Sequence, residues 1–510
     1  MTMTTAQASE DDDLRLPPVL TVLWAGGPDA DATAIGEAAK LLQAASGAAA
    51  ERWPDVYRQP GRARLICRDD DPPSPEAAEA AKRAGVAIEA QGGGAANCDA
   101  ALLTRRDFAG IPASLPALVA EPGAAARLAI DFGFEPALEG APRRRDDAAA
   151  SPAAIAEALL SPPRRAGDRR DLLAYQREDP GRRAHRYEYA LLLRLIGEPS
   201  DSSSETDNSW TRAAAANAAA SVDRGEALDR LRREFERADA LALAYGRRWR
   251  STLAARSFLL FAVNFASGFV GVLVPAASPV TVPLQFAMTG LIYLDQIVAR
   301  RRRWRVKWLD YRRAAESARI ARFCVLAGIA PPETASGSWI DWRLRRVLRA
   351  APAAALAEQD AKAFLAYLGE VEIAPQIAYH RAAYRRFRRL DARLRRAATA
   401  TLLTSAALGA ALAAIALSGL LRAPFSALAA VGLALSAGPG LSAALNGLRN
   451  QLDVVRQAAR SARIGLALRR LSRALAGAPP NAALAQSAAR RAAEIMLDDV
   501  SAWDRAMEIV

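Results

Sequence analysis

Few residues in this chain of 510 could perform acid–base chemistry. It has two histidines, His185 and His380, and His380 follows Gln376 and Tyr379 in the segment QIAYH. General-base catalysis and histidine–metal sites need a histidine or paired carboxylates with positioned partners, and the sequence shows no such partners. We therefore predict no enzyme activity, no metal site and no cofactor. The polar face that includes His380 is expected to pack against a neighbouring helix, with a catalytic role as the alternative.

A second candidate site lies near the N-terminus. Gly26 and Gly27 follow an apolar run from Val19 to Trp24, and Asp99 precedes another apolar run. Ligands of parallel sheets bind beyond the carboxyl ends of the strands, so these three residues are weak candidates for a cofactor or nucleotide site. They are not part of a GxGxxG or Walker pattern, and a turn with a helix-facing aspartate is the favoured interpretation.

Two pairs of hydrophobic segments lie in the second half of the chain. The first pair is uncharged from Ser257 to Val274 and from Leu284 to Leu294; the second spans Ala397 to Leu421 and Phe425 to Leu448. A helix needs about 17–25 mainly apolar residues to cross a bilayer. We predict four crossings, the first two at about 257–275 and 280–298 and the others within 397–448. A buried helical hairpin in a soluble core is the alternative.

Arginine clusters flank these segments, and the net charge is +13. The positive-inside rule then predicts a multi-pass protein of the bacterial inner (cytoplasmic) membrane with both termini in the cytosol. Because the clusters adjoin hydrophobic segments, anionic lipid headgroups explain the charge better than nucleic acid does. The residues expected at the membrane or its interface are Trp249, Asn264, Asp295, Arg300, Arg301, Arg302, Arg303, Trp304, Trp308 and Pro439.

Two of these residues have specific expectations. A carboxylate within a membrane is costly and often marks an ion path, but Asp295 lies at the end of its segment and could instead reach the interface. Pro439 stands between Gly438 and Gly440, so we expect the last hydrophobic helix to bend or break there.

The fold class that we predict is an α/β N-terminal Rossmann-like domain followed by an all-α membrane region with two transmembrane helical hairpins and long cytosolic helices. Alternating strand and helix patterns indicate a parallel sheet, and Ser74 is the expected cap of a helix from Ser74 to Gly85. The expected parts are a disordered tail (1–15), the α/β domain (16–135), a linker and helical connector (136–220), the first stalk helix and hairpin (221–330), a cytosolic helical connector (331–396), the second hairpin (397–448) and C-terminal cytosolic helices (449–510).

The three cysteines, Cys67, Cys98 and Cys324, are far apart and form no CxxC pair. Neither a disulfide framework nor a zinc site is expected from such spacing, so we predict reduced thiols.

The pattern around the hydrophobic segments resembles the SLATT-type membrane proteins, the SMODS- and SLOG-associating two-transmembrane effector domains. The resemblance covers about residue 234 to the C-terminus and depends on spaced polar and aromatic residues, among them Asp310, Tyr311, Arg312, Glu316, Gln376, Tyr379 and His380. The layout of residues 20–130 is similar to the SLOG-like Rossmannoid domain that often precedes them, although the Gly-rich loop and acidic partner of that domain are not recognisable.

This resemblance implies a membrane effector in bacterial conflict or phage defence that perturbs or permeabilises the bilayer in response to a cytosolic signal. The expected partners are the lipid bilayer with its anionic headgroups, further copies of the chain in a homo-oligomer, and a nucleotide-derived signal; no nucleic acid is expected. A non-conducting membrane scaffold that recruits cytosolic partners is the alternative, and a membrane-anchored nucleotide-binding protein is the third hypothesis.

Overall fold

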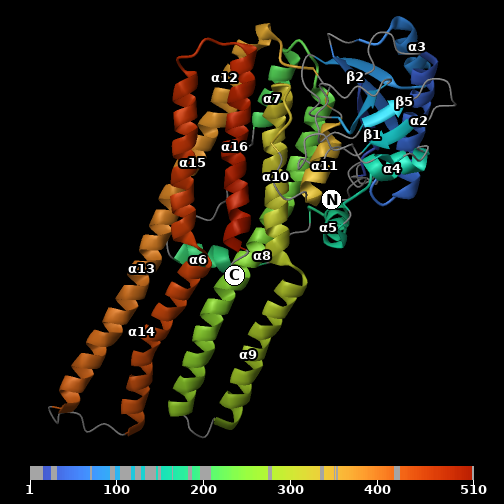
Figure 1. Cartoon of the computed structure of the whole chain (residues 1–510). Helices are drawn as coiled ribbons and strands as arrows, with labels where there is room; N and C mark the ends of the chain where they lie inside the picture. Colours follow the sequence, from blue (N-terminus) through green and yellow to red (C-terminus); the bar gives the residue numbers. More distant parts are fainter. Residues whose placement is uncertain are drawn as a thin grey trace, which may run out of the picture.

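The chain folds into an α/β domain beside a long helical body, as Figure 1 shows for a computed structural model. The structure describes residues 15–24, 32–68, 72–91, 98–103, 117–120, 128–131, 145–146, 151–163, 165–181, 186–195, 208–273, 278–332, 338–349, 351, 354–417 and 425–507. The α/β unit lies in the N-terminal part of the chain and the long helices follow it, in the order that the sequence predicts.

A seven-stranded sheet with the order β3-β2-β1-β4-β5-β6-β7 forms the centre of the α/β domain. Its first five strands in this order are mutually parallel, while β6 is antiparallel to β5 and β7 to β6. The strands are β1 (Val19–Trp24), β2 (Arg62–Arg68), β3 (Ala87–Gln91), β4 (Ala100–Leu103), β5 (Ala117–Ala120), β6 (Leu128–Asp131) and β7 (Arg145–Asp146). The strand order reverses between β1 and β4, which is where ligands bind in open parallel sheets.

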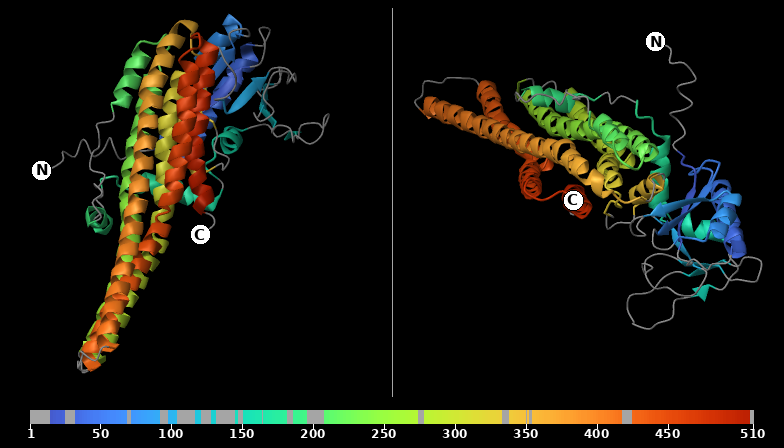
Figure 2. Two further views of the ribbon diagram at one scale, coloured as in Figure 1. Left: turned by 90° about the vertical axis from the view of Figure 1, so that its left-hand side faces the viewer. Right: turned by 90° about the horizontal axis from the view of Figure 1, so that it is seen from above.

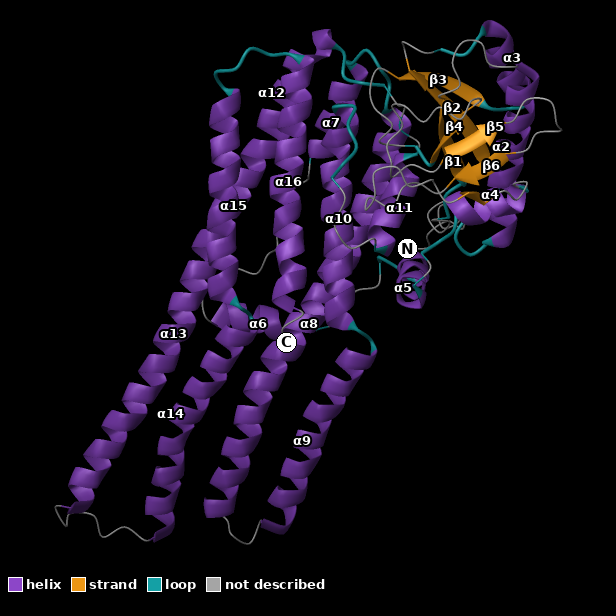
Figure 3. Cartoon of the chain, viewed as in Figure 1, coloured by secondary structure: helices purple, strands orange, loops and turns teal. Residues whose placement is uncertain are grey.

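One face of this sheet is covered by α2 (Ala32–Arg52), with α3 (Pro75–Arg83) and α4 (Pro152–Leu159) beside it. Figure 3 shows these helices next to the strands. Leu20, Val22 and Trp24 are buried in one core cluster with α2, because alternate residues of a strand point to the same face. The Ser74 side chain accepts a hydrogen bond from the backbone N–H of Ala77, so the predicted helix cap is confirmed.

The helical body is built around α8 (Gly225–Leu273) and α13 (Ala374–Leu417), which have 49 and 44 residues. The other helices after the α/β domain are α5 (Ala166–Arg177), α6 (Glu188–Leu195), α7 (Ser209–Ala218), α9 (Ser278–Arg301), α10 (Trp304–Leu326), α11 (Trp339–Leu348), η2 (Glu358–Asp360), α12 (Ala361–Tyr367), the π-helical turn η3 (Leu368–Ile373), α14 (Phe425–Gln451), α15 (Val454–Leu475) and α16 (Ala482–Met507). The residues expected to link the domains therefore include helices α4 to α7 in their described parts.

Four helices project from the body as a long arm, which Figures 1 and 2 show from three directions. The arm consists of α9, α14 and the adjoining halves of α8 and α13. Each hairpin joins the next body helix through a residue with left-handed backbone geometry, Arg303 (φ 51°) before α10 and Asp453 (φ 50°) before α15. This conformation is uncommon for residues other than glycine. The same arrangement of two hairpin helices followed by a body helix therefore occurs twice.

The prediction of a transmembrane region is wrong for the described part of the chain. None of its helices has both the length and the mean apolarity that crossing a bilayer requires. The hydrophobic segments are continuations of longer helices: α8 has charged residues throughout its body half, and α9 includes Gln285, Thr289 and Asp295. The predicted fold class with two transmembrane hairpins, the multi-pass function and the inner-membrane localisation are corrected accordingly.

Of the bend or break expected at Pro439, the break does not occur, since α14 continues through this residue. A Cβ atom on Gly438 would lie 2.3 Å from the Ser405 Cβ atom of α13, and one on Gly440 would lie 3.1 Å from the Phe261 ring of α8. The two glycines thus permit close packing of α14 against both long helices.

Candidate functional site

A buried ionic cluster joins the sheet to α11 at the boundary between the α/β domain and the helical body. Asp99 stands directly before β4, and its Oδ2 atom accepts a 2.9 Å hydrogen bond from the backbone N–H of Thr21 in β1. Its Oδ1 atom accepts hydrogen bonds from Nη2 of Arg346 and Nη2 of Arg349, each at 2.9 Å. We call Thr21, Arg64, Asp99, Arg346 and Arg349 the sheet–α11 latch.

Arg64 connects the latch to β2. Its Nε atom donates to Thr21 Oγ1 at 3.0 Å, and its Nη2 atom donates to the Ala351 carbonyl, just after α11, at 2.9 Å. Glu89 in β3 forms an ion pair with the same guanidinium at 3.2 Å. Parallel sheets need cover on both faces. Thr21 and Arg64 point away from the α2 face, so the helical body supplies this cover at the amino ends of β1 and β2.

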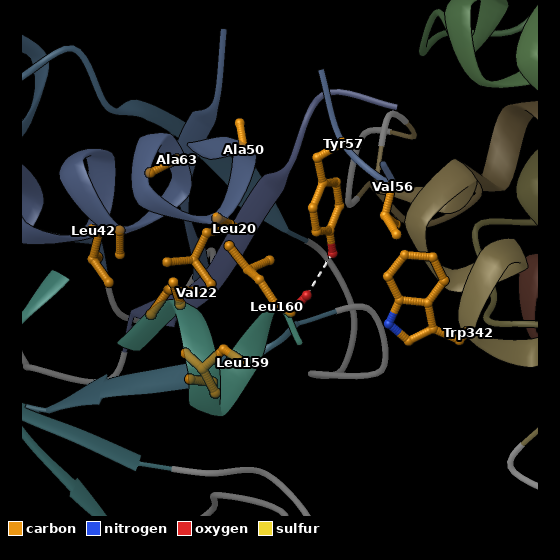
Figure 4. Packing of buried hydrophobic residues seen from close by; sticks show 14 of the residues in the cluster. Leu20, Val22, Leu42, Ala50, Val56, Tyr57, Ala63, Leu159, Leu160 and Trp342 are labelled. Atoms are coloured by element: carbon orange, nitrogen blue, oxygen red, sulfur yellow. Dashed lines mark hydrogen bonds between the residues drawn. The ribbon is translucent and has the colours of Figure 1, made fainter. Parts of the chain in front are cut away.

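Apolar and neutral contacts extend the latch. The Tyr57 hydroxyl donates to the Leu160 carbonyl at 2.7 Å, and Nε1 of Trp342 in α11 donates to the Ser161 carbonyl at 3.1 Å. The Tyr57 and Trp342 rings pack with their centroids 5.8 Å apart, and Figure 4 shows them at the edge of the α/β core. A buried tyrosine or tryptophan of this kind contributes apolar area and one oriented hydrogen bond. The interface is thus a packed core as well as an ion pair.

Cys98 lies beside the latch and is buried with Leu23, Ile66 and Ala101. Burial raises the pKa of the Cys98 thiol to about 11, despite the opposing effect of Arg349. The thiol is therefore protonated near neutral pH and is a poor nucleophile, since the thiolate is the reactive form. Cys67 and Cys324 are also buried, and none of the three cysteines forms a disulfide in the structure.

Of the three residues predicted as weak candidates for a ligand site, the structure describes only Asp99. Gly26 and Gly27 lie outside the described residues. Asp99 was expected at the carboxyl end of the sheet, but it lies level with Thr21 at the amino end of β4 and is fully engaged by the latch. At the carboxyl end, the described residue of note is Trp24, the last residue of β1: it is 1% exposed and its indole N–H has no hydrogen-bond partner.

Asp295 is not isolated at the base of the arm. Its Oδ1 atom forms a 2.8 Å ion pair with Arg186, which also binds Glu188 of α6 at 2.9 Å. Arg303 pairs with Asp171 of α5, while Arg300, Arg301 and Arg302 are exposed. The paired residues therefore tie the arm to the connector helices.

The tryptophans predicted at a membrane interface lie within the protein instead. Trp249 packs in the core cluster around Leu253, and Trp304 and Trp308 pack against the large core that includes the α/β domain. The Trp308 indole contacts α8 so closely that a Cβ on Gly246 would lie 2.9 Å from its Nε1 atom. Pro439 is exposed on α14, and the side chain of Asn264 in α8 lies outside the described residues.

The residues behind the family resemblance support helix packing. Tyr311 is 2% exposed and lies in an aromatic group with Tyr175, Tyr245 and Trp339. Asp310 and Gln376 are half-buried. The His380 ring is buried and meets the Tyr379 ring edge-on at 5.2 Å. His380 also lies against Gly465 of α15.

Glu316 of α10, also a residue of this group, lies beside two arginines. Burial alone would raise the pKa of Glu316, but ion pairs with Arg312 and Arg319 outweigh burial and lower the pKa to about 2. Arg312 extends the network to Asp239 of α8 at 3.3 Å. These charges connect α8 and α10 within the body.

Because the pKa of Glu316 is lower in the folded state than in the unfolded state, its ionised form stabilises the fold. This stability is present above about pH 4.5 and is lost as the pH falls toward the pKa of the folded state. We therefore expect the wild-type protein to lose more stability between about pH 4.5 and pH 2 than the Glu316→Gln variant. Urea denaturation followed by circular dichroism across this range measures the difference. Parallel pH profiles for the two proteins would contradict the assignment.

The sequence analysis did not predict the two latch arginines of α11 as site residues. Arg346 and Arg349 belong to the segment WIDWRLRRVLR, where they resemble the basic residues of any exposed amphipathic helix. The available signal was Trp339 and Trp342 at helical spacing, which marks this short helix as buried. Glu234 of α8, which pairs with Arg343 and accepts a hydrogen bond from Tyr175 at 2.9 Å, lacked any such signal.

Comparisons of the chain with family models, with curated proteins and with solved structures found no match. Within the described residues there is no group of three or more histidine, cysteine, aspartate or glutamate side chains that could hold a metal ion.

Proposed function

We propose that this chain is a non-enzymatic signal-coupling protein. Its α/β domain receives a small nucleotide-derived ligand at the carboxyl edge of β1 and β4, and the helical body with its arm transmits the response to a partner. The observation that carries this proposal is the sheet–α11 latch, because it holds the same two strands that flank the reversal of strand order.

The latch is suited to transmission because a shift of either strand moves a charged contact. Asp99 accepts one bond from β1 and two from the end of α11, and all three of its partners are buried. Buried charges tolerate little displacement, since an unpaired buried ion is costly. The Trp24 indole N–H at the carboxyl end of β1 has no partner among the described residues, which supports a ligand there, because buried donors normally have a partner.

Asp99→Asn tests this coupling. The variant keeps an acceptor for the Thr21 N–H but removes the charge from Arg346 and Arg349, and breaking a buried pair in this way costs about 3–5 kcal/mol. We expect hydrogen exchange to rise in β1, β4 and α11 together, without unfolding of α13 to α16.

A nucleotide panel then tests the sensing role in the full chain by hydrogen-exchange mass spectrometry. A bound nucleotide should change exchange in both the sheet and α11 of the wild-type protein, and only in the sheet of Asp99→Asn. The exposed Asp55→Asn is the matched control. Absence of binding across the panel, or an unchanged response of α11 in Asp99→Asn, would reject the proposal.

A second candidate function, assembly with further copies of the chain, is favoured by the surface of the arm. Phe286, Leu291 and Leu294 of α9 are 75%, 57% and 56% exposed. Contiguous exposed apolar surface marks an interaction site. Gly290 lies between Phe286 and Leu294 on one helical face, and no atom lies within 4 Å of a Cβ built on it. Such a small residue permits the close approach of another helix, and the same face of α9 in a second copy of the chain is such a helix.

Light scattering of the purified chain tests this assembly. We expect the mass of the wild-type protein to exceed that of one chain, and Phe286→Ser with Leu294→Ser to lower it toward one chain. Leu466→Ser, at an exposed residue of α15 outside the arm, is the control. A monomeric wild-type protein would end this second candidate and leave the first intact.

A further inference from the structure

The latch has fewer acceptors than its arginines can use. A single carboxylate oxygen, Asp99 Oδ1, receives bonds from both Arg346 and Arg349. Arg346 makes one further bond, from Nη2 to the Leu159 carbonyl at 3.1 Å. Within the part of the chain that the structure describes, its Nε and Nη1 atoms, and Nε of Arg349, have no hydrogen-bond partner. The two residues are only 7% and 6% exposed, so water does not readily supply the missing acceptors.

The latch also has more positive than negative charges. Arg346 and Arg349 share one negative charge, and Arg64 has its own partner in Glu89. The carboxyl end of α11 lies at this point and offsets part of the excess through its partial negative charge. Among the described residues, one net positive charge nevertheless remains in a buried setting, where unsatisfied polar groups are costly.

We propose that Arg346 and Arg349 form an oxyanion site for a phosphate group, and that Asp99 occupies this site while the α/β domain is docked. A phosphate has about two negative charges and at least three acceptor oxygens. It can therefore serve both guanidinium groups, including the donors that Asp99 leaves unused, in the bidentate geometry that arginine favours. Phosphate and Asp99 compete for the same Nη2 atoms, so binding of the anion releases the sheet from α11.

This site differs from the carboxyl edge of the sheet and does not require a ligand there. Asp99 and the latch arginines lie at the amino end of β4, whereas Trp24 ends β1 at the opposite edge. The proposal therefore stands or falls separately from the sensing function.

The experiment removes the competitor and offers the anion. Isothermal titration of the full-length Asp99→Ala variant with inorganic phosphate, at ionic strength matched with chloride, should show binding at least about tenfold tighter than to the wild-type protein. The triple variant Asp99→Ala, Arg346→Gln, Arg349→Gln should lose this binding. Arg52→Gln in the Asp99→Ala background, at an exposed arginine of α2, should retain it.

Adenosine and adenosine monophosphate separate the sources of the phosphate. Equal affinity for phosphate and adenosine monophosphate supports the site and identifies free phosphate as its occupant. Tighter binding of the nucleotide, with no binding of adenosine, supports the site and identifies a nucleotide phosphate as its occupant. Equal phosphate affinity in the wild-type protein and Asp99→Ala, or undiminished binding without the two arginines, overturns the proposal. If Asp99→Ala does not fold, Asp99→Asn provides the same comparison, because it retains an acceptor for Thr21.

Discussion

Replacing Glu372 with alanine should destabilise the helical body by about 3–5 kcal/mol, because it leaves Arg322 charged and unpaired in the core. The two side chains are each 1% exposed. Arg322 of α10 donates from Nε to Oε1 of Glu372 at 3.0 Å and from Nη2 to Oε2 at 2.8 Å. Urea denaturation followed by circular dichroism measures the loss.

Three further contacts make this pair the centre of the body. The Tyr367 hydroxyl donates to Glu372, and Arg322 donates from Nη1 to Ser209 Oγ at 2.5 Å. The Arg322 guanidinium also lies over the Trp210 ring at 4.5 Å. Glu372 belongs to the π-helical turn η3, and such turns often occur where a side chain must be redirected for a specific role. The pair thus joins α7, α10 and η3.

Two variants distinguish loss of pairing from loss of packing. Arg322→Met combined with Glu372→Leu removes both charges, and we expect it to be less destabilised than Glu372→Ala alone. Glu236→Gln breaks an exposed ion pair with Arg232, whose two side chains are each 55% exposed, and should cost less than about 0.5 kcal/mol. A double variant as unstable as Glu372→Ala would show that the unpaired charge of Arg322 is not the source of the loss.

Replacing Gly61 with alanine should be nearly as damaging to the α/β domain. A Cβ atom there would lie 2.5 Å from the carbonyl carbon and oxygen of Ser46 in α2. Backbone atoms cannot rotate away, so β2 and α2 must separate. The Gln43 side chain bridges the same junction, accepting from the Ala63 N–H at 2.9 Å and donating to the Gly61 carbonyl at 3.0 Å. We expect a loss of about 3 kcal/mol, the upper end for overpacking, in urea unfolding of the full chain.

Gly47→Ala is the matched control for this substitution. Gly47 lies in α2 one residue after Ser46, and an added Cβ would meet no atom within 4 Å. Alanine favours a helix over glycine by about 1 kcal/mol, so this variant should be as stable as the wild-type protein or more stable. Equal losses from Gly47→Ala and Gly61→Ala would indicate that the close contact with Ser46 is not maintained.

The sequence alone determined most of the local structure. Val19 to Trp24 forms β1 and Ser74 caps α3, as predicted, because strand patterning and helix capping depend on neighbours within a few residues. The long uncharged segments are helical in their described parts for the same reason. Their assignment to a bilayer depended on hydrophobicity averaged along the chain, and the described helices do not meet that criterion.

Only the tertiary structure determined what these elements contact. Asp99 and Arg349 are 250 residues apart, and Arg322 and Glu372 are 50 apart; their charges would be equally plausible on a solvated surface. Burial turns such residues into specific partners, because a charge removed from water requires an opposite charge and hydrogen bonds at fixed positions. The candidate aspartate could thus be found from the sequence. Its attachment to α11, and the unused donors beside it, follow only from the packing of the α/β domain against the helical body.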